Sequence, residues 1–563
     1  MNHHLSLRSK LIIMVSVMAS LFLVALDQTI IATALGKIVE EFNAFSSLGW
    51  IVTAYLITTT ITVPIAGKLS DLFGRRIMLL IGVALFTGAS LFSGMSGSVT
   101  DLIIWRAVQG IGGGIITANA FTIVGDLFAA RERGKWQGLI GAVFGLSSVI
   151  GPLLGGFLTD GHSIFGLMTD WRWTFFINIP FGVMAFALIM KFCPPLRHAK
   201  KPSVDYLGAT LLALALGVLI LAVDNTETIF ADLLSATGLS LVGLRVIMGV
   251  IVALATAAFI FVERRAKEPI LPLYLFRNRN FVLVVTIALL FGAAFMGSIL
   301  YLTQFNQQVF GATPTESGLM LLPMVGGIMV ASIGSGQVIA KTGRYKVFMQ
   351  IGIIVATLAM FALTTLTPEK SFLYEALIII PLGLGMGVMM PVMNLVVQTE
   401  FSQKELGVAT SSSQLFRSLG STVGTAVFGA LLTAGLVAQL GNVQDNSYIQ
   451  RLQSSPEVSK LGSLDDVNTL LTLNMPDVKE KITTGAHEGL ATIQPAERRD
   501  AATQAFDKEQ AAFSSTVTHA FSDSLQTIFV TSSIILLITT ALVFMIKETP
   551  LGQGRPDETP GEA

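Results

Sequence analysis

Residues 67–76 read GKLSDLFGRR, and residues 336–345 read GQVIAKTGRY. The two segments share a glycine at their first and eighth positions and an arginine at their ninth, each 269 residues apart. The same offset relates three further glycine pairs: Gly138 and Gly407, Gly151 and Gly420, and Gly155 and Gly424. Six matches at one offset indicate that the chain contains two related halves.

The composition excludes most classes of soluble protein. The 563 residues are 52% hydrophobic and 13% charged, whereas soluble domains carry about 25% charged residues. Lys+Arg and Asp+Glu balance at 36 each, so no net charge recruits a nucleic acid. Cys193 is the one cysteine and the six histidines are scattered, so the sequence predicts neither a disulfide framework nor a metal site.

Long apolar runs predict an all-α polytopic membrane protein. About 20 apolar residues suffice to cross a bilayer, and backbone groups in lipid must be paired within a helix. We expect fourteen spans, at 11–35, 48–70, 77–96, 101–127, 134–158, 172–192, 205–223, 242–262, 280–304, 315–340, 346–366, 372–398, 407–436 and 524–546.

The distribution of basic residues predicts the orientation. Lys and Arg concentrate in the loops on the side of the N-terminus, whereas the short loops on the other side carry only Lys37, Arg172, Arg245 and Lys370. By the positive-inside rule, both termini are expected in the cytoplasm.

The repeat and the spans together predict the domain organisation. We expect an N-terminal six-helix bundle (1–200), two inserted helices (201–268) and a C-terminal six-helix bundle (269–436 and 519–549). The polar segment 437–518 is an extracytoplasmic insertion, expected to form a helical cap or hairpin that continues into the last span and offers a surface for an external partner. A cytoplasmic tail (550–563) follows.

Five segments resemble the major facilitator superfamily, specifically its fourteen-helix drug:proton antiporters. They are LDQTIIATAL (26–35), GKLSDLFGRR (67–76), WRAVQGIGGG (105–114), GLSSVIGPLLGG (145–156) and WRWTFFINIP (171–180). The chain departs from the first motif at Gly36, where a proline is usual. The resemblance implies alternating access by two six-helix bundles, driven by the proton motive force without a cofactor. It also implies drugs or lipophilic cations as substrates, exchanged for protons across a bacterial cytoplasmic membrane.

Asp27 and Arg106 are the candidate proton-coupling residues. At 1.5 Å per residue, Asp27 lies about 10 Å and Arg106 about 7 Å from the outer surface, so the two share a depth. A carboxylate at such a depth is costly unless it is protonated or paired. The alternatives are a helix-end acid facing water and an arginine extending toward the headgroups. The resemblance implies that Arg106 responds to the protonation of Asp27.

A second group lies at the cytoplasmic ends of the second, third and fourth spans. The resemblance implies that it is a conformational switch that latches the two halves together; its members are Gly67, Asp71, Gly74, Arg75 and Asp126. Ordinary positive-inside arginines with adjacent acids are the alternative, but they do not account for the glycine spacing.

Small and polar residues supply the remaining candidates. A hinge or helix interface is predicted in the fifth span, at Gly151, Pro152, Gly155 and Gly156. Candidates for the substrate path are Gln109, Asn119, Asn178, Gln304, Met324, Met390, Asn394, Gln414 and Arg417. Arg417 lies near the middle of its span, so we expect it to have an inward-facing partner.

Proton-driven export of hydrophobic or amphiphilic small molecules is therefore the leading hypothesis. A lipid or siderophore exporter with the same fold is the alternative. A membrane-embedded enzyme is disfavoured because no paired acids, histidine cluster or nucleophile motif lie at one depth. A receptor would leave the repeat and Asp27 unexplained. No GxxxxGK[ST] loop occurs, so the sequence offers no sign of ATP as the energy source.

Overall fold

The computed structural model describes residues 6–42, 48–159, 161–164, 166–193, 204–223, 226–312, 314–403, 405–440, 446–453, 467–474, 476–491, 495–549 and 551. Within these residues, fourteen helical segments are long and apolar enough to cross a membrane, as predicted. They are α1 (Leu7–Phe42), α2 (Leu48–Phe73), α3 (Arg75–Gly94), α4 (Val99–Leu127), α5 (Ala130–Thr159), α6 with α7 (Trp173–Phe176 and Asn178–Phe192), α8 (Tyr206–Val223), α11 (Leu241–Glu263), α12 (Arg279–Gln308), α14 (Leu322–Thr342), α15 (Lys346–Leu363), α16 (Phe372–Glu400), α17 (Leu406–Leu440) and α21 (Ala496–Met545).

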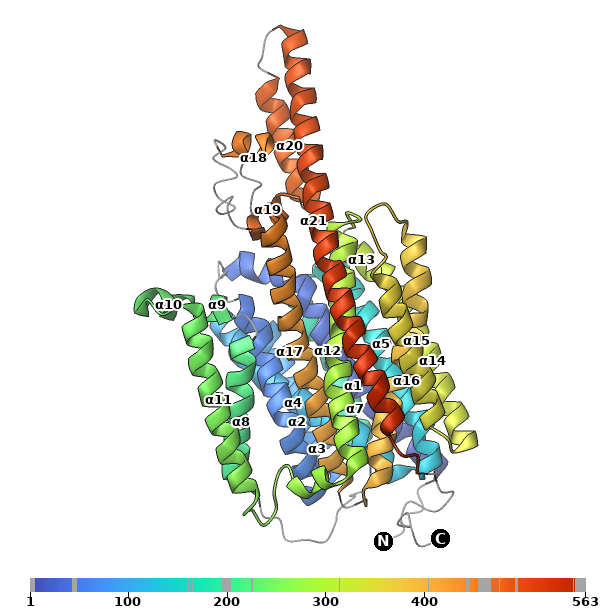
Figure 1. The fold of residues 1–563 in the computed structure, drawn as a ribbon. Helices are drawn as coiled ribbons and strands as arrows, with labels where there is room; N and C mark the ends of the chain where they lie inside the picture. The colour runs from blue at the N-terminus through green and yellow to red at the C-terminus, as the bar shows by residue number, and fades with distance from the viewer. Residues whose placement is uncertain are drawn as a thin grey trace.

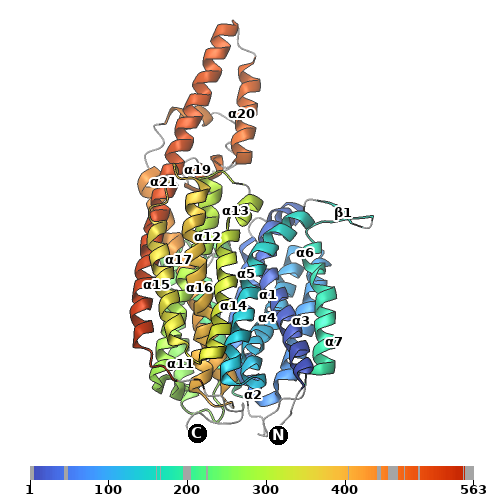
Figure 2. The ribbon, with the colours of Figure 1, turned by 90° about the vertical axis from the view of Figure 1, so that its right-hand side faces the viewer.

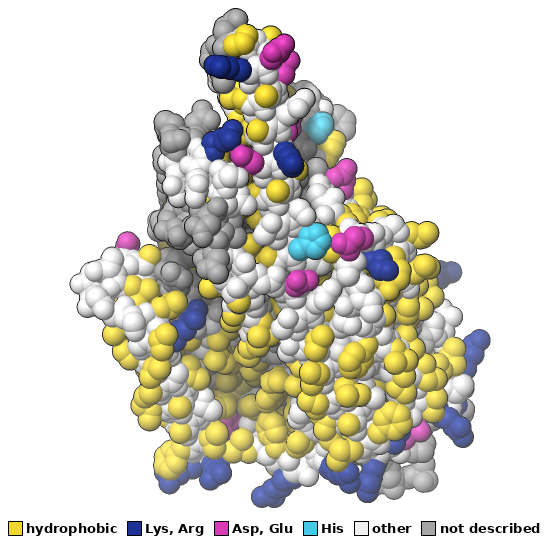
Figure 3. All heavy atoms as spheres, turned by 45° about the horizontal axis from the view of Figure 1, so that its top comes forward, with side chains coloured by type: hydrophobic (Ala, Val, Ile, Leu, Met, Phe, Trp, Pro, Cys, Tyr) yellow, Lys and Arg dark blue, Asp and Glu magenta, His cyan; other side chains and the backbone are white. Residues whose placement is uncertain are grey.

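The spanning helices gather into two bundles that stand side by side (Figure 2). The helices from α1 to α7 form one bundle, and α12, α14 to α17 and α21 form the other. The pair α8 and α11 packs at the side, where α8 contacts α2 and α17 (Figure 1). Apolar side chains cover the flanks of the molecule and Lys and Arg gather at its lower end (Figure 3), as expected of a surface in contact with lipid.

The two bundles meet through two helix pairs, and the repeat relates one pair to the other. On one side α2 packs against α17, and on the other α14 packs against α5. A side chain at Gly67 would overlap Ser411, and one at Gly336 would overlap the backbone of Gly134. A Cβ at Gly138 would likewise overlap the backbone of Ser332. The repeated glycines therefore allow close contact between the halves, which explains why they recur at one offset.

The glycines predicted as a hinge in the fifth span have the same kind of role inside each bundle. Gly151 and Gly155 lie against α1, where a Cβ would overlap threonine hydroxyls. Their repeat counterparts Gly420 and Gly424 lie against α12. Pro152 faces the second half of the chain, where a Cβ at Gly318 would lie 3.5 Å from it. The segment is thus an interface on two sides, and its motion as a hinge stays a prediction.

Two spans differ from the continuous helices that the sequence predicts. The sixth is interrupted at Ile177 and the tenth at Leu321, which separates α13 (Pro314–Met320) from α14. Proline causes both breaks, because Pro180 and Pro323 cannot donate the backbone hydrogen bond to the residue four positions earlier. A short antiparallel hairpin of β1 (Ser163–Ile164) and β2 (Leu167–Met168), also not predicted, precedes α6.

The insertion before the last span is helical and packed. It comprises α18 (Ser447–Leu452), α19 (Val467–Leu473), α20 (Pro476–Leu490) and the first half of α21, and it projects from the end opposite the start of α1 (Figure 1). Helix α21 has 50 residues, about 75 Å of helix, so much of it lies beyond a hydrocarbon core of about 30 Å. Tyr448, Phe506 and Phe513 are buried against one another in the projecting part.

This packing sets the boundary at which the insertion can be removed. Helices α17 and α21 run antiparallel (Figure 1), and a Cβ at Gly435 would lie 2.6 Å from Ser524, which puts Leu440 opposite a position near His519. Replacing 441–516 with a short Gly/Ser linker removes the aromatic cluster whole. We expect this variant to stay monodisperse in detergent, with an unfolding temperature close to that of the intact chain.

Replacing 445–505 instead leaves Phe506 and Phe513 without Tyr448, and we expect aggregation or binding of a hydrophobic dye. Size-exclusion chromatography and thermal unfolding of both variants test the boundary. Equal behaviour of the two deletions would contradict it.

Candidate functional site

Asp27 lies at the centre of a buried polar cluster between α1, α3, α4 and α7. Its Oδ2 accepts a hydrogen bond from an Arg106 guanidinium nitrogen at 2.5 Å. Its Oδ1 accepts from the amides of Gln109 at 2.8 Å and Asn178 at 3.3 Å. Both of those amides also donate to Ser90 Oγ, at 3.2 and 2.9 Å. The structure thus brings together two residues predicted for proton coupling and two predicted for the substrate path.

Arg106 is held from its other side by α2. Its Nε donates to the carbonyl of Ile51 at 3.3 Å, and its guanidinium lies 4.3 Å from the centre of the Tyr55 ring. A further aromatic ring, that of Phe175, is 5.8 Å away. The side chains of Asp27 and Arg106 are each only 1% exposed. This excludes both a water-facing Asp27 and an Arg106 that extends to the headgroups.

Glycines in α4 make this arrangement possible. A Cβ at Gly110 would overlap the Thr58 hydroxyl, and one at Gly113 would lie 2.8 Å from the Tyr55 hydroxyl. The segment WRAVQGIGGG therefore places its arginine and glutamine on the Asp27 side while its glycines allow α2 to approach. The spacing of the motif follows from these two requirements.

The contacts of Arg106 depend on the charge of Asp27. Removing one partner of a buried ion pair typically costs about 3–5 kcal/mol, because the remaining charge is left uncompensated. A proton bound at Asp27 removes the negative charge and leaves Arg106 with dipoles and aromatic rings alone. The cluster can therefore convert binding or release of a proton into movement of α4 relative to α1.

A second cluster lies at the ends of α2, α3 and α4 and contains the predicted switch residues. Arg75 pairs with Asp71 and, through its Nε, with Asp126 at 2.8 Å. The carboxylate of Asp71 accepts the backbone N–H of Val408 at 3.1 Å, at the start of α17 in the other bundle. The acids and the arginine thus form one network that crosses the bundle interface.

The two other switch residues act in different ways: Gly67 allows α2 to approach Ser411 of α17, and Gly74 provides an unusual backbone conformation. Gly74 separates α2 from α3 with φ of 97°, and its counterpart Gly343 separates α14 from α15 with φ of 71°. Both values favour glycine. Gly407 matters equally, because a Cβ there would overlap Asp71 and Arg75.

Arg133 and Gln398 join the bundles at the same end. Arg133, near the start of α5, donates to the carbonyl of Gln398 in α16 at 2.8 Å and to that of Gly125 in α4 at 2.9 Å. The Gln398 amide donates in return to the carbonyl of Phe121 at 2.8 Å. The ends that we predict to be cytoplasmic are therefore closed in this structure.

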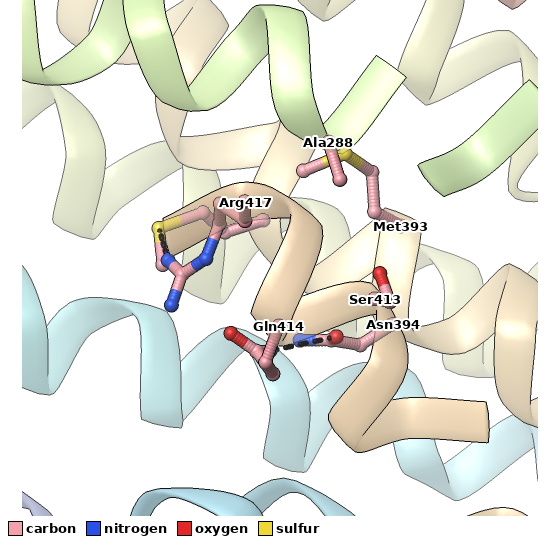
Figure 4. Close-up of a pocket in the computed structure, with 7 residues that line it drawn as sticks. Ala288, Met393, Asn394, Ser413, Gln414 and Arg417 are labelled. Atoms are coloured by element: carbon pink, nitrogen blue, oxygen red, sulfur yellow. Dashed lines mark hydrogen bonds between the residues drawn. The ribbon is translucent and has the colours of Figure 1, made fainter. Parts of the chain in front are cut away.

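Four of the predicted substrate-path residues surround one narrow pocket in the second bundle (Figure 4). Met390, Asn394, Gln414 and Arg417 line it, with Ala288, Met393 and Ser413. The Gln414 amide donates to Asn394 Oδ1 at 3.0 Å, and an Arg417 guanidinium nitrogen lies 3.5 Å from the Met390 sulfur. The pocket is too tight for a drug-sized molecule in this conformation.

The other substrate-path candidates lie elsewhere. Gln109 and Asn178 belong to the Asp27 cluster. Asn119 is fully buried and donates to the carbonyl of Ile115 in its own helix at 2.8 Å. Met324 is 1% exposed, packed in the core of the second bundle, and Gln304 is half-buried in α12.

Tyr55, Ser90 and Glu375 are polar residues of interest that sequence reasoning missed. Tyr55 and Ser90 complete the Asp27 cluster, but neither residue type stands out in an apolar span. Glu375 is fully buried in the first turn of α16, a position at which a sequence pattern indicates a solvated helix end. Only the packing of the neighbouring helices reveals its burial.

Comparison with known proteins gives a consistent family assignment. The model of the Major Facilitator Superfamily matches residues 17–425. "Multidrug transporter protein MdtP" of Bacillus subtilis is 37% identical over 475 residues, covering 82% of this chain and 83% of that protein. "Multidrug resistance protein 3" of the same organism is 32% identical over 421 residues, covering 75% and 79%.

Solved structures share the fold at low sequence identity. The human organic anion transporter MFSD10 aligns with a TM-score of 0.55 at 16% identity, over 75% of this chain and 93% of that one. The proton:xylose symporter XylE aligns with a TM-score of 0.54 at 17% identity, over 76% and 90%. The chain is a multi-pass membrane protein, and it belongs to the major facilitator superfamily.

Proposed function

We propose that this protein exports hydrophobic and amphiphilic drugs across a bacterial cytoplasmic membrane in exchange for protons. Similarity to the two Bacillus drug transporters supports a drug substrate. The lipid or siderophore alternative has no comparable support. The observation that best supports proton coupling is the buried contact between Asp27 and Arg106. An isolated acid–base pair between membrane-spanning helices responds directly to proton binding.

In this proposal the structure is a state of the transport cycle that is closed at the end predicted to be cytoplasmic. Asp27 is in direct contact with Arg106. The cytoplasmic ends are closed by the Asp71 network and by Arg133 with Gln398. Protonation of Asp27 would free Arg106, and the resulting shift of α4 would act on Asp126, which lies near the end of the same helix. Opening toward the cytoplasm then breaks the contacts of Asp71 with α17.

Drug-induced proton release from proteoliposomes tests the proposal. When lipophilic cations or neutral drugs enter the lumen, protons should leave it in exchange and the lumen should become more alkaline. An imposed pH gradient should in turn drive drug uptake. Drug movement that is independent of the pH gradient would overturn proton coupling, and the absence of drug movement would overturn export.

Asp27→Asn should abolish proton-coupled drug movement and leave expression unchanged, because the amide keeps the side-chain shape but binds no proton. Arg106→Ala should also abolish it, whereas Arg106→Lys should retain part of the activity through its point charge. Asp101→Asn, an exposed change in the first turn of α4, is the matched control and should behave like the unmodified protein. Active efflux by Asp27→Asn driven by a pH gradient would contradict the role of Asp27.

Gly67→Ala should open the cytoplasmic side, because the added methyl group meets Ser411 across the interface. Overpacking of this kind costs about 1–3 kcal/mol, so the ratio of closed to open molecules should fall roughly 5- to 150-fold. Spin labels at the cytoplasmic ends of α2 and α17 can measure the change. Gly334→Ala in α14 is the control, because space surrounds that glycine.

Asp71→Asn and Arg75→Ala act on the same network and should slow turnover without changing equilibrium drug binding. An altered drug-binding profile in either variant would place these residues in the binding site instead.

A further inference from the structure

Arg417 differs from the other arginines described above within the spans, because it has neither a carboxylate nor a backbone carbonyl as a partner among the described residues, whereas Arg133 donates to the carbonyls of Gln398 and Gly125. Arg75 and Arg106 each pair with a carboxylate. Within the described part of the chain, no ion pair involves Arg417, and its Nε atom is buried without a hydrogen-bond partner. The partner that its position in the span predicts is therefore missing from the described residues.

The surroundings of Arg417 do not compensate its charge. A terminal nitrogen lies 3.5 Å from the Met390 sulfur, and the guanidinium lies 5.7 Å from the centre of the Phe144 ring. A thioether is a weak acceptor and an aromatic ring supplies only a partial negative charge. Both contacts leave an elementary positive charge in a region of low dielectric, which strongly favours an approaching anion.

The place of Arg417 is suited to a ligand that moves between the bundles. It lies about 17 Å along α17 from Leu406, near the middle of a hydrocarbon core of about 30 Å. Phe144 belongs to α5 of the other bundle, so the guanidinium is at the bundle interface. In Figure 4 the guanidinium and the Gln414 amide both project from α17 toward α5.

We propose that Arg417 binds the anionic group of an amphiphilic molecule, a carboxylate, sulfonate or phosphate, within the transport path. The proposal deepens the proposed drug export and rests on it for the direction of transport. Gln414 contributes an unpartnered amide oxygen beside Arg417, which can accept a hydrogen bond from a hydroxyl or ammonium group of the same molecule. Met390 and Met393 are flexible enough to reshape the apolar wall.

The ligand expected at Arg417 thus differs from the lipophilic cations that the family resemblance implies, which would bind elsewhere in the transport path. A monocation without an anionic group would be repelled by Arg417 unless it bound elsewhere along the interface. Zwitterionic and acidic amphiphiles are the class that the pocket selects.

Matched fluorescent probes test this assignment at equilibrium, without a proton gradient. We would compare a dansyl-labelled amino-acid carboxylate with its neutral methyl amide, using the full-length protein in zwitterionic nanodiscs. The unmodified protein should bind the carboxylate about tenfold more tightly or better. Arg417→Met should abolish this preference and leave affinity for the amide within about twofold. Arg417→Lys should retain part of it.

Two controls separate recognition from a structural effect. Arg245→Met removes an exposed arginine from α11 with the same change in net charge, and it should leave the preference intact. Removing an unpaired buried charge does not weaken packing, so Arg417→Met should unfold at the same or a higher temperature. The carboxylate should raise the unfolding temperature of the unmodified protein but not that of Arg417→Met.

Adding phosphatidylglycerol to the nanodiscs tests whether the anionic group that Arg417 binds belongs to a lipid. Displacement of the carboxylate probe by this lipid would assign the anion site to a lipid headgroup, and lack of displacement would assign it to a soluble amphiphile. Equal affinity of the unmodified protein for carboxylate and amide would overturn the proposal, as would an equal loss of both in Arg417→Met. These binding measurements use no proton gradient, so a failure of proton coupling is recognised separately in the proteoliposome assay.

Discussion

A charge inside a bilayer must be neutralised or hydrogen-bonded, and the arrangement of the first bundle follows from satisfying this condition for Asp27 and Arg106. Helices α2, α4 and α7 contribute partners to the pair, and Ser90 of α3 accepts from the two amides, which requires α2 and α3 to approach α4 closely. The glycines of α4 allow that approach. The contact is therefore both a packing constraint and the point at which a single proton can change the balance of charge.

Buried charges are also paired and hydrogen-bonded at the bundle interface. Asp71 uses its carboxylate for Arg75 within the first bundle and for the N–H of Val408 in the second, so loss of either contact affects the other. Because α4 carries Arg106, Gln109 and Asp126, it links the buried cluster to this interface through one continuous helix. A rigid helix is sufficient to connect the two sites, and no chain of intermediate contacts is needed.

The sequence predicts the spans, the repeat and the shared depth of Asp27 and Arg106, because hydropathy and spacing carry that information directly. It does not predict Ser90, Tyr55 or the burial of Glu375, because these depend on which faces of different helices meet. The breaks at Ile177 and Leu321 follow from prolines that a hydropathy window overlooks. The sequence indicates the packed core of the insertion only through the helical spacing of Phe506 and Phe513. The residue that packs against them, Tyr448, lies in a separate short helix.

The two halves carry different charges in their interiors despite their common origin. The repeat counterpart of Asp27 is Met296, and Arg417 has its counterpart at Ser148. The first bundle thus contains a complete acid–base pair whose polar atoms are largely satisfied within the protein, whereas the second contains a cation facing the interface with nothing to neutralise it in the described residues. A paired charge is suited to bind and release a proton, and an unpaired one is suited to hold a ligand. Under the proposed antiport, divergence of the two halves at these positions would separate the two tasks between the bundles, which would then need only to move against each other to exchange a proton for a substrate.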